Sequence, residues 1–293
     1  MPLAVTAPTG NVGSHVLRLL VEAGERPIVL ARHPEKIAPE LRERVEIRQG
    51  DQGDAEFVKQ ATEGVDALYW LDPGSEDPQD PLAASARMAE SVAGAVKKNG
   101  IARAVFQSSV GAERRKGMGA IDGLGLTEEA LDATGASVTH LRCGYFYSNL
   151  MFSVGDLCEG ILTTNLPPDL KLPWVAPVDI AGAVVTRLRD AEWTGRRVQG
   201  VYGPEDLSFH DVARILSRAL GREIRIVPQS DRDVETALLD AGMSYAAAEA
   251  NVQMSRGMRD GITLDPPRDA DSTTPTTLAQ WAAAELKPTL EAL

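Results

Sequence analysis

A turn near the N-terminus has the composition and position of a dinucleotide-binding site. Gly10 and Gly13 lie between an apolar run, Leu3–Thr6, and a helical pattern, Val12–Ala23. At such a junction, backbone N–H groups and the positive end of the helix face a pyrophosphate. Ala7 stands where the usual motif has its first glycine. The prediction of a dinucleotide site therefore depends on the position of the turn between a strand and a helix. The alternative is a plain tight turn. The predicted phosphate-binding residues are Thr9, Gly10, Asn11, Val12 and Gly13.

The end of the second expected strand, Pro27–Ala31, decides between the two nicotinamide dinucleotides. An acidic residue there binds the ribose hydroxyls of NAD, whereas an arginine pairs with the 2′-phosphate of NADP. This chain has Arg32 and His33 at that place and no acid. The cofactor is therefore predicted to be NADPH. The alternative for Arg32 is a surface arginine, and His33 is expected to be solvated.

Polar or small residues follow the next expected strands, which are Val45–Gln49, Ala67–Leu71 and Arg103–Ser108. Ligands of open α/β sheets bind at the carboxyl ends of parallel strands. Asp51 and Gln52 are therefore predicted to frame the adenine, although Asp51 is equally suited to cap a turn or a helix. Two segments that end these strands, Leu71-Asp72-Pro73 and Gln107-Ser108-Ser109, are predicted to line the crevice along which the cofactor runs, with Leu71 and Ser108 as cofactor contacts.

An aromatic segment follows the expected strand Ser137–Arg142 and provides the candidates for chemistry. Gly144 and Tyr145 are predicted to contact the cofactor. Tyr145 and Tyr147 are the candidate catalytic residues, because a phenol can donate a hydrogen bond to a reduced oxygen. Phe146 is predicted to stack on the substrate. The alternative is that these rings pack between two lobes.

The elements that position these residues alternate between strand and helix through the first half of the chain. A long helix is expected over Leu82–Asn99. This alternation predicts an α/β fold of the Rossmann type, with a doubly wound parallel sheet covered on both faces. Further along, the patterns predict helices over Asp179–Asp190 and Ser208–Leu220, strands over Val198–Tyr202 and Ile224–Pro228, and mostly helix from Asp231, closing with Thr276–Leu293.

Composition excludes several classes of protein. The formal net charge of −12 opposes binding to nucleic acid and to anionic membranes. No apolar run approaches the ~20 residues that span a bilayer, and the first strand leaves no room for a targeting segment. Cys143 and Cys158 lack C-x-x-C spacing, and the histidines are far apart in the expected fold, so no metal site is predicted. A cytoplasmic location is expected.

Several segments together carry a family resemblance. They are T-G-N-V-G-S, A-R-H-P-E-K, Q-G-D, S-S-V-G-A-E, L-R-C-G-Y-F-Y-S-N and P-V-D-I-A. In order and spacing they resemble the NmrA-like atypical short-chain dehydrogenases/reductases. The resemblance implies a Rossmann domain over residues 1–150 and a smaller, interleaved α/β substrate lobe over residues 151–293, with the substrate cleft between them. It also implies that the segment around Tyr145 passes over the nicotinamide.

The family resemblance does not settle the chemistry, because the Tyr-x-x-x-Lys acid of ordinary short-chain dehydrogenases is absent from this chain. Asn149 is expected to orient the aromatic segment and contact the substrate, or to cap the next helix. Cys143 stands where the family usually has proline and is expected to pack in the core rather than act as a nucleophile.

The leading interpretation is an NADPH-dependent oxidoreductase, a quinone reductase for example, that reduces a small electron-poor molecule such as a quinone or an aromatic polyketide-like compound. Hydride transfer to such an acceptor needs close approach more than a strong acid. One alternative is a non-catalytic NADP-sensing regulator that acts through a protein partner, and another is a family member with non-redox chemistry. A monomer or a homodimer is expected.

Overall fold

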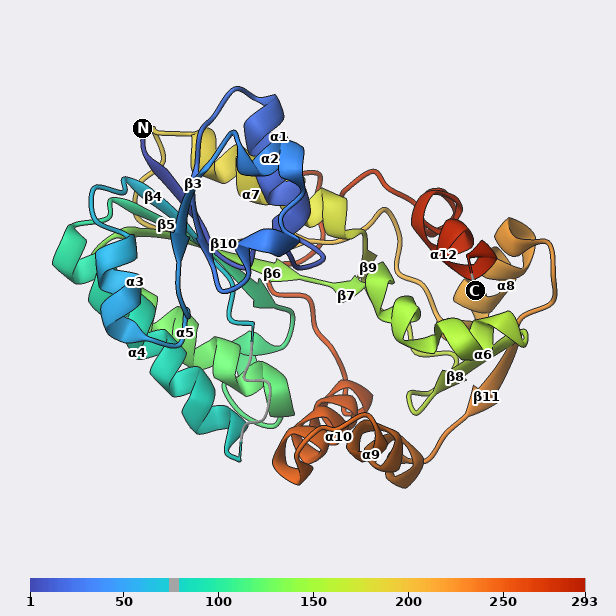
Figure 1. Cartoon of the computed structure of the whole chain (residues 1–293). Helices are drawn as coiled ribbons and strands as arrows, with labels where there is room; N and C mark the ends of the chain where they lie inside the picture. Colours follow the sequence, from blue (N-terminus) through green and yellow to red (C-terminus); the bar gives the residue numbers. More distant parts are fainter. Residues whose placement is uncertain (74–78, 293) are drawn as a thin grey trace.

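A parallel sheet of seven strands forms the centre of the larger lobe (Figure 1). The computed structural model describes residues 1–73 and 79–292. The strand order is β3-β2-β1-β4-β5-β6-β10, which is the Rossmann order extended by one strand. Every neighbouring pair is parallel. The strands are β1 (Leu3–Val5), β2 (Ile28–Ala31), β3 (Glu46–Gln49), β4 (Ala67–Trp70), β5 (Arg103–Ser109), β6 (Ser137–Cys143) and β10 (Arg196–Val201).

Helices cover both faces of this sheet, as the alternating sequence pattern predicts. Side chains of a strand point alternately to the two faces, so Leu3 and Val5 pack on one layer of helices and Ala4 on the other. The first layer consists of α1 (Gly13–Glu22) and α7 (Pro177–Arg189). The second layer consists of α3 (Ala55–Ala61), α4 (Pro81–Asn99) and α5 (Asp122–Asp132). Short helical segments join them: η1 (Pro34–Lys36), α2 (Pro39–Arg42), η2 (Ala112–Arg114) and η3 (Gly119–Ile121).

The smaller lobe is built around a cluster of buried aromatic side chains. The Trp174 ring stacks on Tyr147 at a centroid distance of 6.3 Å and meets Phe209 edge-on at 5.5 Å. Trp281 closes the cluster, 5.8 Å from Tyr147. The elements of this lobe are β7 (Tyr145–Phe146), η4 (Tyr147–Ser153), α6 (Val154–Cys158), β8 (Ile161–Thr164), β9 (Trp174–Val175), α8 (Phe209–Leu220), β11 (Arg225–Pro228), α9 (Asp231–Asp240), α10 (Tyr245–Arg259), α11 (Leu278–Trp281), η5 (Ala282–Leu286) and α12 (Lys287–Glu291).

The two lobes exchange segments of chain. After β6 the chain crosses into the smaller lobe, and it returns to supply α7 and β10 to the large sheet (Figure 1). The crossing is tight at Gly144, where a Cβ atom would lie 1.8 Å from the Pro173 carbonyl oxygen. A boundary near residue 150 therefore describes the organisation only approximately and stays a prediction.

The structure confirms the predicted α/β class and departs from the predicted elements mainly after β6. The capping box at Ser208 forms as expected, because its hydroxyl accepts a hydrogen bond from the Asp211 N–H at 3.1 Å. The chain between α10 and α11 is not helical, although mostly helix was expected there. It passes the end of β10, where Tyr202 N–H donates to the Ser272 carbonyl and Thr274 N–H to the Tyr202 carbonyl. In the part of the chain that the structure describes, no helix is long and apolar enough to cross a bilayer.

Candidate functional site

The turn between β1 and α1 has the geometry of a phosphate cradle. Ala7 adopts a left-handed conformation with φ of 49°, and the Gly10 N–H donates to its carbonyl at 3.1 Å. A Cβ atom at Gly13 would lie 1.9 Å from the same carbonyl oxygen, so only glycine fits there. Within the described chain, no side chain caps the N-terminus of α1. Ser14 N–H donates to the Gly10 carbonyl at 3.0 Å, and the other N–H groups of the first helical turn can face an anion.

The predicted phosphate-binding residues contribute in different ways. Thr9 and Gly10 line a cavity of about 260 Å³, here named the nucleotide cavity. Val12 is 3% exposed and packs in the core, so it can contribute only its backbone N–H. Asn11 is exposed and Gly13 buried, and neither lines this cavity.

Residues from the ends of β2 and β3 complete the nucleotide cavity. Arg32, His33 and Lys36 bring cationic or titratable side chains to one part of its wall, and Asp51 and Gln52 line it as well. The concentration of basic groups is what a 2′-phosphate would require.

Asp51 takes the capping role that the sequence left open. Its Oδ1 accepts a hydrogen bond from Gly53 N–H at 2.7 Å, which forms a turn before α3. Gln52 donates from Nε2 to the Leu71 carbonyl at 2.6 Å and so ties this turn to the end of β4.

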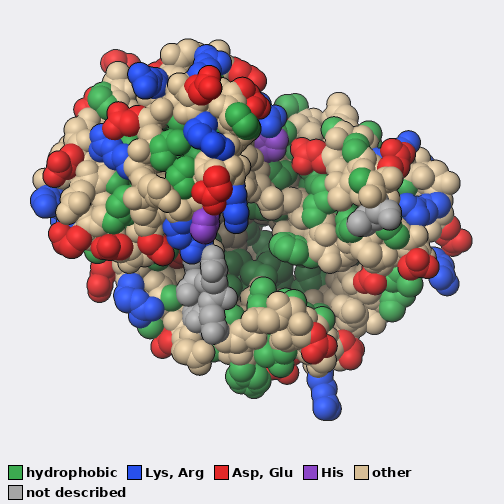
Figure 2. All heavy atoms as spheres, viewed as in Figure 1, with side chains coloured by type: hydrophobic (Ala, Val, Ile, Leu, Met, Phe, Trp, Pro, Cys, Tyr) green, Lys and Arg blue, Asp and Glu red, His purple; other side chains and the backbone are tan. Residues whose placement is uncertain are grey.

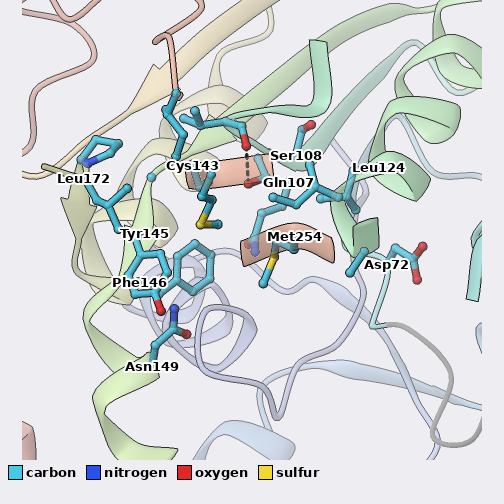
Figure 3. A pocket seen from close by; sticks show the side chains of 18 of the residues that line it. Asp72, Gln107, Ser108, Leu124, Cys143, Tyr145, Phe146, Asn149, Leu172 and Met254 are labelled. Carbon is cyan, nitrogen blue, oxygen red and sulfur yellow. Dashed lines mark hydrogen bonds between the residues drawn. The ribbon is translucent and has the colours of Figure 1, made fainter. Parts of the chain in front are cut away.

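A second cavity, of about 390 Å³ and here named the central cavity, lies at the carboxyl ends of β4, β5 and β6. It opens between the two lobes, where Figure 2 shows a hollow with hydrophobic side chains on its floor. Pro73 lines both this cavity and the nucleotide cavity, so the two adjoin at this residue. Its lining includes Leu71, Gln107, Ser108, Cys143, Gly144, Tyr145, Phe146, Asn149, Leu172, Met254 and Met258 (Figure 3).

The structure brings Tyr145, Phe146 and Asn149 together on one wall of the central cavity (Figure 3). Tyr145 packs edge-on against Trp174 with a centroid distance of 4.5 Å. Burial raises the pKa of the Tyr145 phenol, and a hydrogen bond with the Asn149 amide opposes part of that rise. The phenol is therefore protonated at neutral pH and can donate a hydrogen bond but cannot act as a base.

Tyr147 does not reach the cavity, although the sequence made it a candidate catalytic residue. It begins the helical turn η4 and is fully buried in the smaller lobe, where it stacks on Trp174. Its hydroxyl donates to the Thr276 carbonyl at 3.3 Å. Burial raises its pKa, and Asp179 raises it further. This tyrosine belongs to the core of the lobe, as the packing alternative anticipated.

Ser108 lines the cavity, but its hydroxyl is engaged behind the wall. It donates to Glu128 Oε1 at 2.7 Å, and Arg142 donates to both oxygens of the same carboxylate at 2.9 and 2.7 Å. Burial alone would raise the pKa of Glu128, but the hydrogen bonds from Arg142 and Ser108 lower it to about 2. This buried ion pair fixes the ends of β5 and β6 beside the cavity.

Gln107 lies at the strand end that the sequence placed along the crevice, but no role of its own was predicted for its amide. It is 5% exposed and lines the central cavity. Tyr69 donates from its hydroxyl to Gln107 Oε1 at 2.6 Å, which fixes the orientation of the amide. Among the described residues no hydrogen bond engages Nε2, so the cavity holds one oriented amide donor in largely apolar walls. A polar residue inside an otherwise apolar strand was the available signal.

Other polar groups offer less chemistry. Cys143 is 1% exposed, and burial raises the pKa of its thiol well above the usual range, so it is not a nucleophile at neutral pH. In the described ranges, no cluster of His, Cys, Asp and Glu could hold a metal ion. The site defines a class of protein. A Rossmann sheet whose phosphate turn accepts only glycine at one position, with a cleft at the strand ends, is typical of a dinucleotide-binding protein that has an adjoining pocket for a small molecule.

Comparison with known proteins agrees with this class. Residues 8–149 match the NAD(P)H-binding family model. The (4-alkanoyl-5-oxo-2,5-dihydrofuran-3-yl)methyl phosphate reductase of Streptomyces griseus is 31% identical over 261 residues, which cover 88% of each chain. The NAD(P)H azoreductase of Xenophilus azovorans is 28% identical over 85% of this chain and 84% of that enzyme. The structure of an Escherichia coli NADPH-dependent quinone oxidoreductase complexed with NADPH has the same fold, with a TM-score of 0.78 at 23% identity, covering 97% and 99% of the two chains.

The chain belongs to the NmrA-like family of NAD(P)H-binding atypical short-chain dehydrogenases/reductases. It is an NAD(P)H-dependent oxidoreductase, as the sequence predicted.

Proposed function

We propose that the protein is an NADPH-dependent reductase of a small, flat, electron-poor acceptor with a conjugated carbonyl group, such as a quinone or an aromatic polyketide-like compound. The observation that carries the proposal is the oriented Gln107 amide in the largely apolar central cavity, at the strand ends where this cavity adjoins the nucleotide cavity. A largely apolar cavity with an oriented amide donor favours a flat molecule that has an oxygen to bind.

The names of two comparison proteins support a carbonyl acceptor. The Streptomyces griseus relative is named for a substrate with oxo and alkanoyl groups, and the Escherichia coli structure is that of a quinone oxidoreductase. The choice of NADPH rests on the basic wall of the nucleotide cavity, where Arg32 and Lys36 would bind a 2′-phosphate.

Bound reduced nicotinamide would supply the hydride for this reaction. The residues of the chain would orient the acceptor and stabilise the charge that develops on it. Gln107 Nε2 would donate a hydrogen bond to the acceptor oxygen, where negative charge accumulates as the carbonyl is reduced. Tyr69 positions that amide through its hydroxyl. Tyr145 and Phe146 would hold the flat ring by stacking, and Asn149 would orient Tyr145. The final proton would come from water or from the Tyr145 phenol.

A panel of acceptors tests the proposal. Purified protein is mixed with NADPH and with quinones, enones and azo dyes, and the nicotinamide absorbance is followed. We expect NADPH consumption with quinones or enones and little with NADH at equal concentration. Tight NADPH binding without consumption across the panel would favour the NADP-sensing regulator instead. The monomeric or dimeric state of the protein and its cytoplasmic location stay predictions.

A further inference from the structure

A third cavity adjoins the substrate side of the cleft. It has a volume of about 520 Å³ and lies between the start of α4, the segment around η3, and α10; we name it the distal cavity. Ser85 and Ala120 line both the distal and the central cavity, so the two meet at these small side chains. The other lining residues include Asp80, Pro81, Leu82, Asp122, Met243, Tyr245, Ala246, Ala247, Glu249 and Ala250.

The carboxylates at the distal cavity are already engaged by neighbouring groups. Asp80 caps α4 and accepts from Ala83 N–H at 3.0 Å. Asp122 accepts from the N–H groups of Gly117 and Met118 at 3.0 and 2.9 Å. These hydrogen bonds fix the two carboxylates in place, where they give the edge of the distal cavity a negative charge.

Three further polar side chains of the lining are engaged in a similar way. Glu249 pairs with Arg256 at 3.2 Å and accepts from Gln253 Nε2 at 3.1 Å. Asn251 donates to the Ala247 carbonyl at 2.8 Å. No Lys, Arg or His is among the described lining residues. An anionic ligand would therefore find no cation, and a polar chain would gain few hydrogen bonds.

The apolar lining, in contrast, is exposed. Leu82, Met243 and Tyr245 are 50%, 40% and 66% exposed and are large apolar side chains. Their gathering at one cavity is what a binding site for an apolar group would show. The base of the distal cavity is closely packed. A Cβ atom at Gly119 would lie 2.1 Å from the Ala250 carbonyl oxygen of α10.

We propose that the acceptor is a bipartite molecule, with its carbonyl-bearing ring in the central cavity and an uncharged apolar chain passing between Ser85 and Ala120 into the distal cavity. This inference rests on the proposed reductase function, since it names the substrate class of the same site. It goes beyond that function by predicting that affinity depends on the chain and not only on the ring.

A homologous series of 2-alkyl-1,4-quinones tests the inference, each used below its aggregation concentration. We expect KM to fall by about fourfold for each of the first methylenes added, the factor that corresponds to burial of one CH₂, while kcat changes little. A chain that ends in a carboxylate should lose most of this gain, because the edge of the distal cavity is acidic.

Three variants localise the effect. Ala120→Leu should narrow the passage and flatten the chain-length dependence, measured as the ratio of KM values for short and long chains within the variant, because Ala120 also lines the central cavity. Leu82→Ala should weaken the dependence without closing the passage. Val227→Ala removes a comparably exposed apolar side chain in β11, away from the cavity, and should leave the dependence unchanged.

The outcomes separate this inference from the proposed function. Turnover of unsubstituted quinone with a KM independent of chain length would overturn the distal-cavity proposal and leave the reductase intact. If no acceptor is turned over, the proposed function fails, and calorimetric titration of the same quinones into the NADP⁺-loaded protein tests the cavity. Equal Kd values for short and long chains would then contradict it as well.

Discussion

Gln107 is the residue on which the proposed chemistry depends most. Replacing it with leucine keeps the side-chain size and removes the donor that would bind the acceptor oxygen. We expect kcat/KM for a quinone to fall by about 10²-fold, as on removal of one oxyanion donor, while the Kd of NADPH is unchanged. Tyr69→Phe should cost about tenfold, because the amide remains but one hydrogen bond that orients it is lost. Unchanged kinetics for Gln107→Leu would remove this residue from the site.

Arg32 should set the choice of cofactor. We expect NADPH to bind at least about tenfold more tightly than NADH, which corresponds to about 1.4 kcal/mol and is modest for a charge-assisted pair. Arg32→Ala should abolish most of this preference in calorimetric titrations. Arg18→Ala, on the exposed side of α1 and outside the nucleotide cavity, is the control and should keep it. Equal affinities for the two dinucleotides in the wild type would refute the assignment.

Tyr145 should shape the pocket rather than supply an essential proton. Tyr145→Phe should lower kcat by less than about tenfold, since a general acid contributes about 10²-fold or more. Replacing Tyr145 or Phe146 with alanine should instead raise the KM of the acceptor through lost stacking area. Tyr147→Phe should leave kcat and KM unchanged and affect only stability, because Tyr147 lies in the core. A loss of 10²-fold in Tyr145→Phe would identify the phenol as the acid.

The sequence predicted correctly that certain residues lie close together where their positions follow from the ends of the strands. Thr9, Gly10, Arg32 and Asp51 follow strand ends, and the structure places them around one cavity. Side-chain direction could not be predicted in the same way. The orientation of Gln107 depends on Tyr69, which lies 38 residues earlier on the neighbouring strand.

At the scale of elements, α5 is held to the sheet by a buried carboxylate. Glu128 is fully buried and is paired with Arg142 of β6 at 2.7 Å. Glu128→Gln would remove the buried, bidentate partner of the guanidinium and, among the described residues, leave it paired only with Asp265 at 2.6 Å and Glu113 at 3.7 Å. We expect a loss of about 3–5 kcal/mol in the free energy of unfolding at pH 7. Glu129→Gln is the matched control, because its partner Arg115 lies at 3.1 Å but its side chain is 58% exposed; it should cost about 0–1 kcal/mol.

The difference in stability between the wild type and Glu128→Gln depends on pH in a defined direction. The folded pKa of Glu128 is lowered from the ordinary value of 4.5 to about 2. The stability from its ionised form is therefore fully present above pH 4.5 and is lost as the pH falls from 4.5 towards 2. Urea denaturation of wild type and Glu128→Gln should give curves that converge over that range. A difference that is small at pH 7, or that grows on acidification, would contradict this account.

Elements with a strong sequence period were predicted, and those made by tertiary pairing were not. The strands β1, β2 and β4 are apolar runs between turn residues, and each of β1 to β6 was found within a residue or two of its predicted bounds. In contrast, β7 and β9 contain two residues each and exist only because they pair with one another. The segment between α10 and α11 carries no strand pattern, yet the long-range bonds to Tyr202 hold it at the end of β10.

At the scale of the whole molecule, the cleft results from the exchange of segments between the lobes. The large sheet supplies the strand ends, and the smaller lobe supplies the aromatic wall. Helix α10 adds Met254, labelled in Figure 3, and Met258 to the lining. The alternating pattern of the first half was sufficient to predict the fold class. The cavity shapes were not predictable, because they depend on how α10 packs against η3, a contact between segments more than a hundred residues apart.

The central claim is that bound NADPH reduces an acceptor held in the central cavity. A single-turnover experiment tests it most directly: enzyme in excess over NADPH is mixed anaerobically with a 2-alkyl-1,4-quinone, and the nicotinamide absorbance is recorded against the quinol formed. The account predicts complete oxidation of the bound NADPH with one quinol per NADPH, and a slower reaction in Gln107→Leu. NADPH that stays bound and reduced in the presence of quinone would contradict the account.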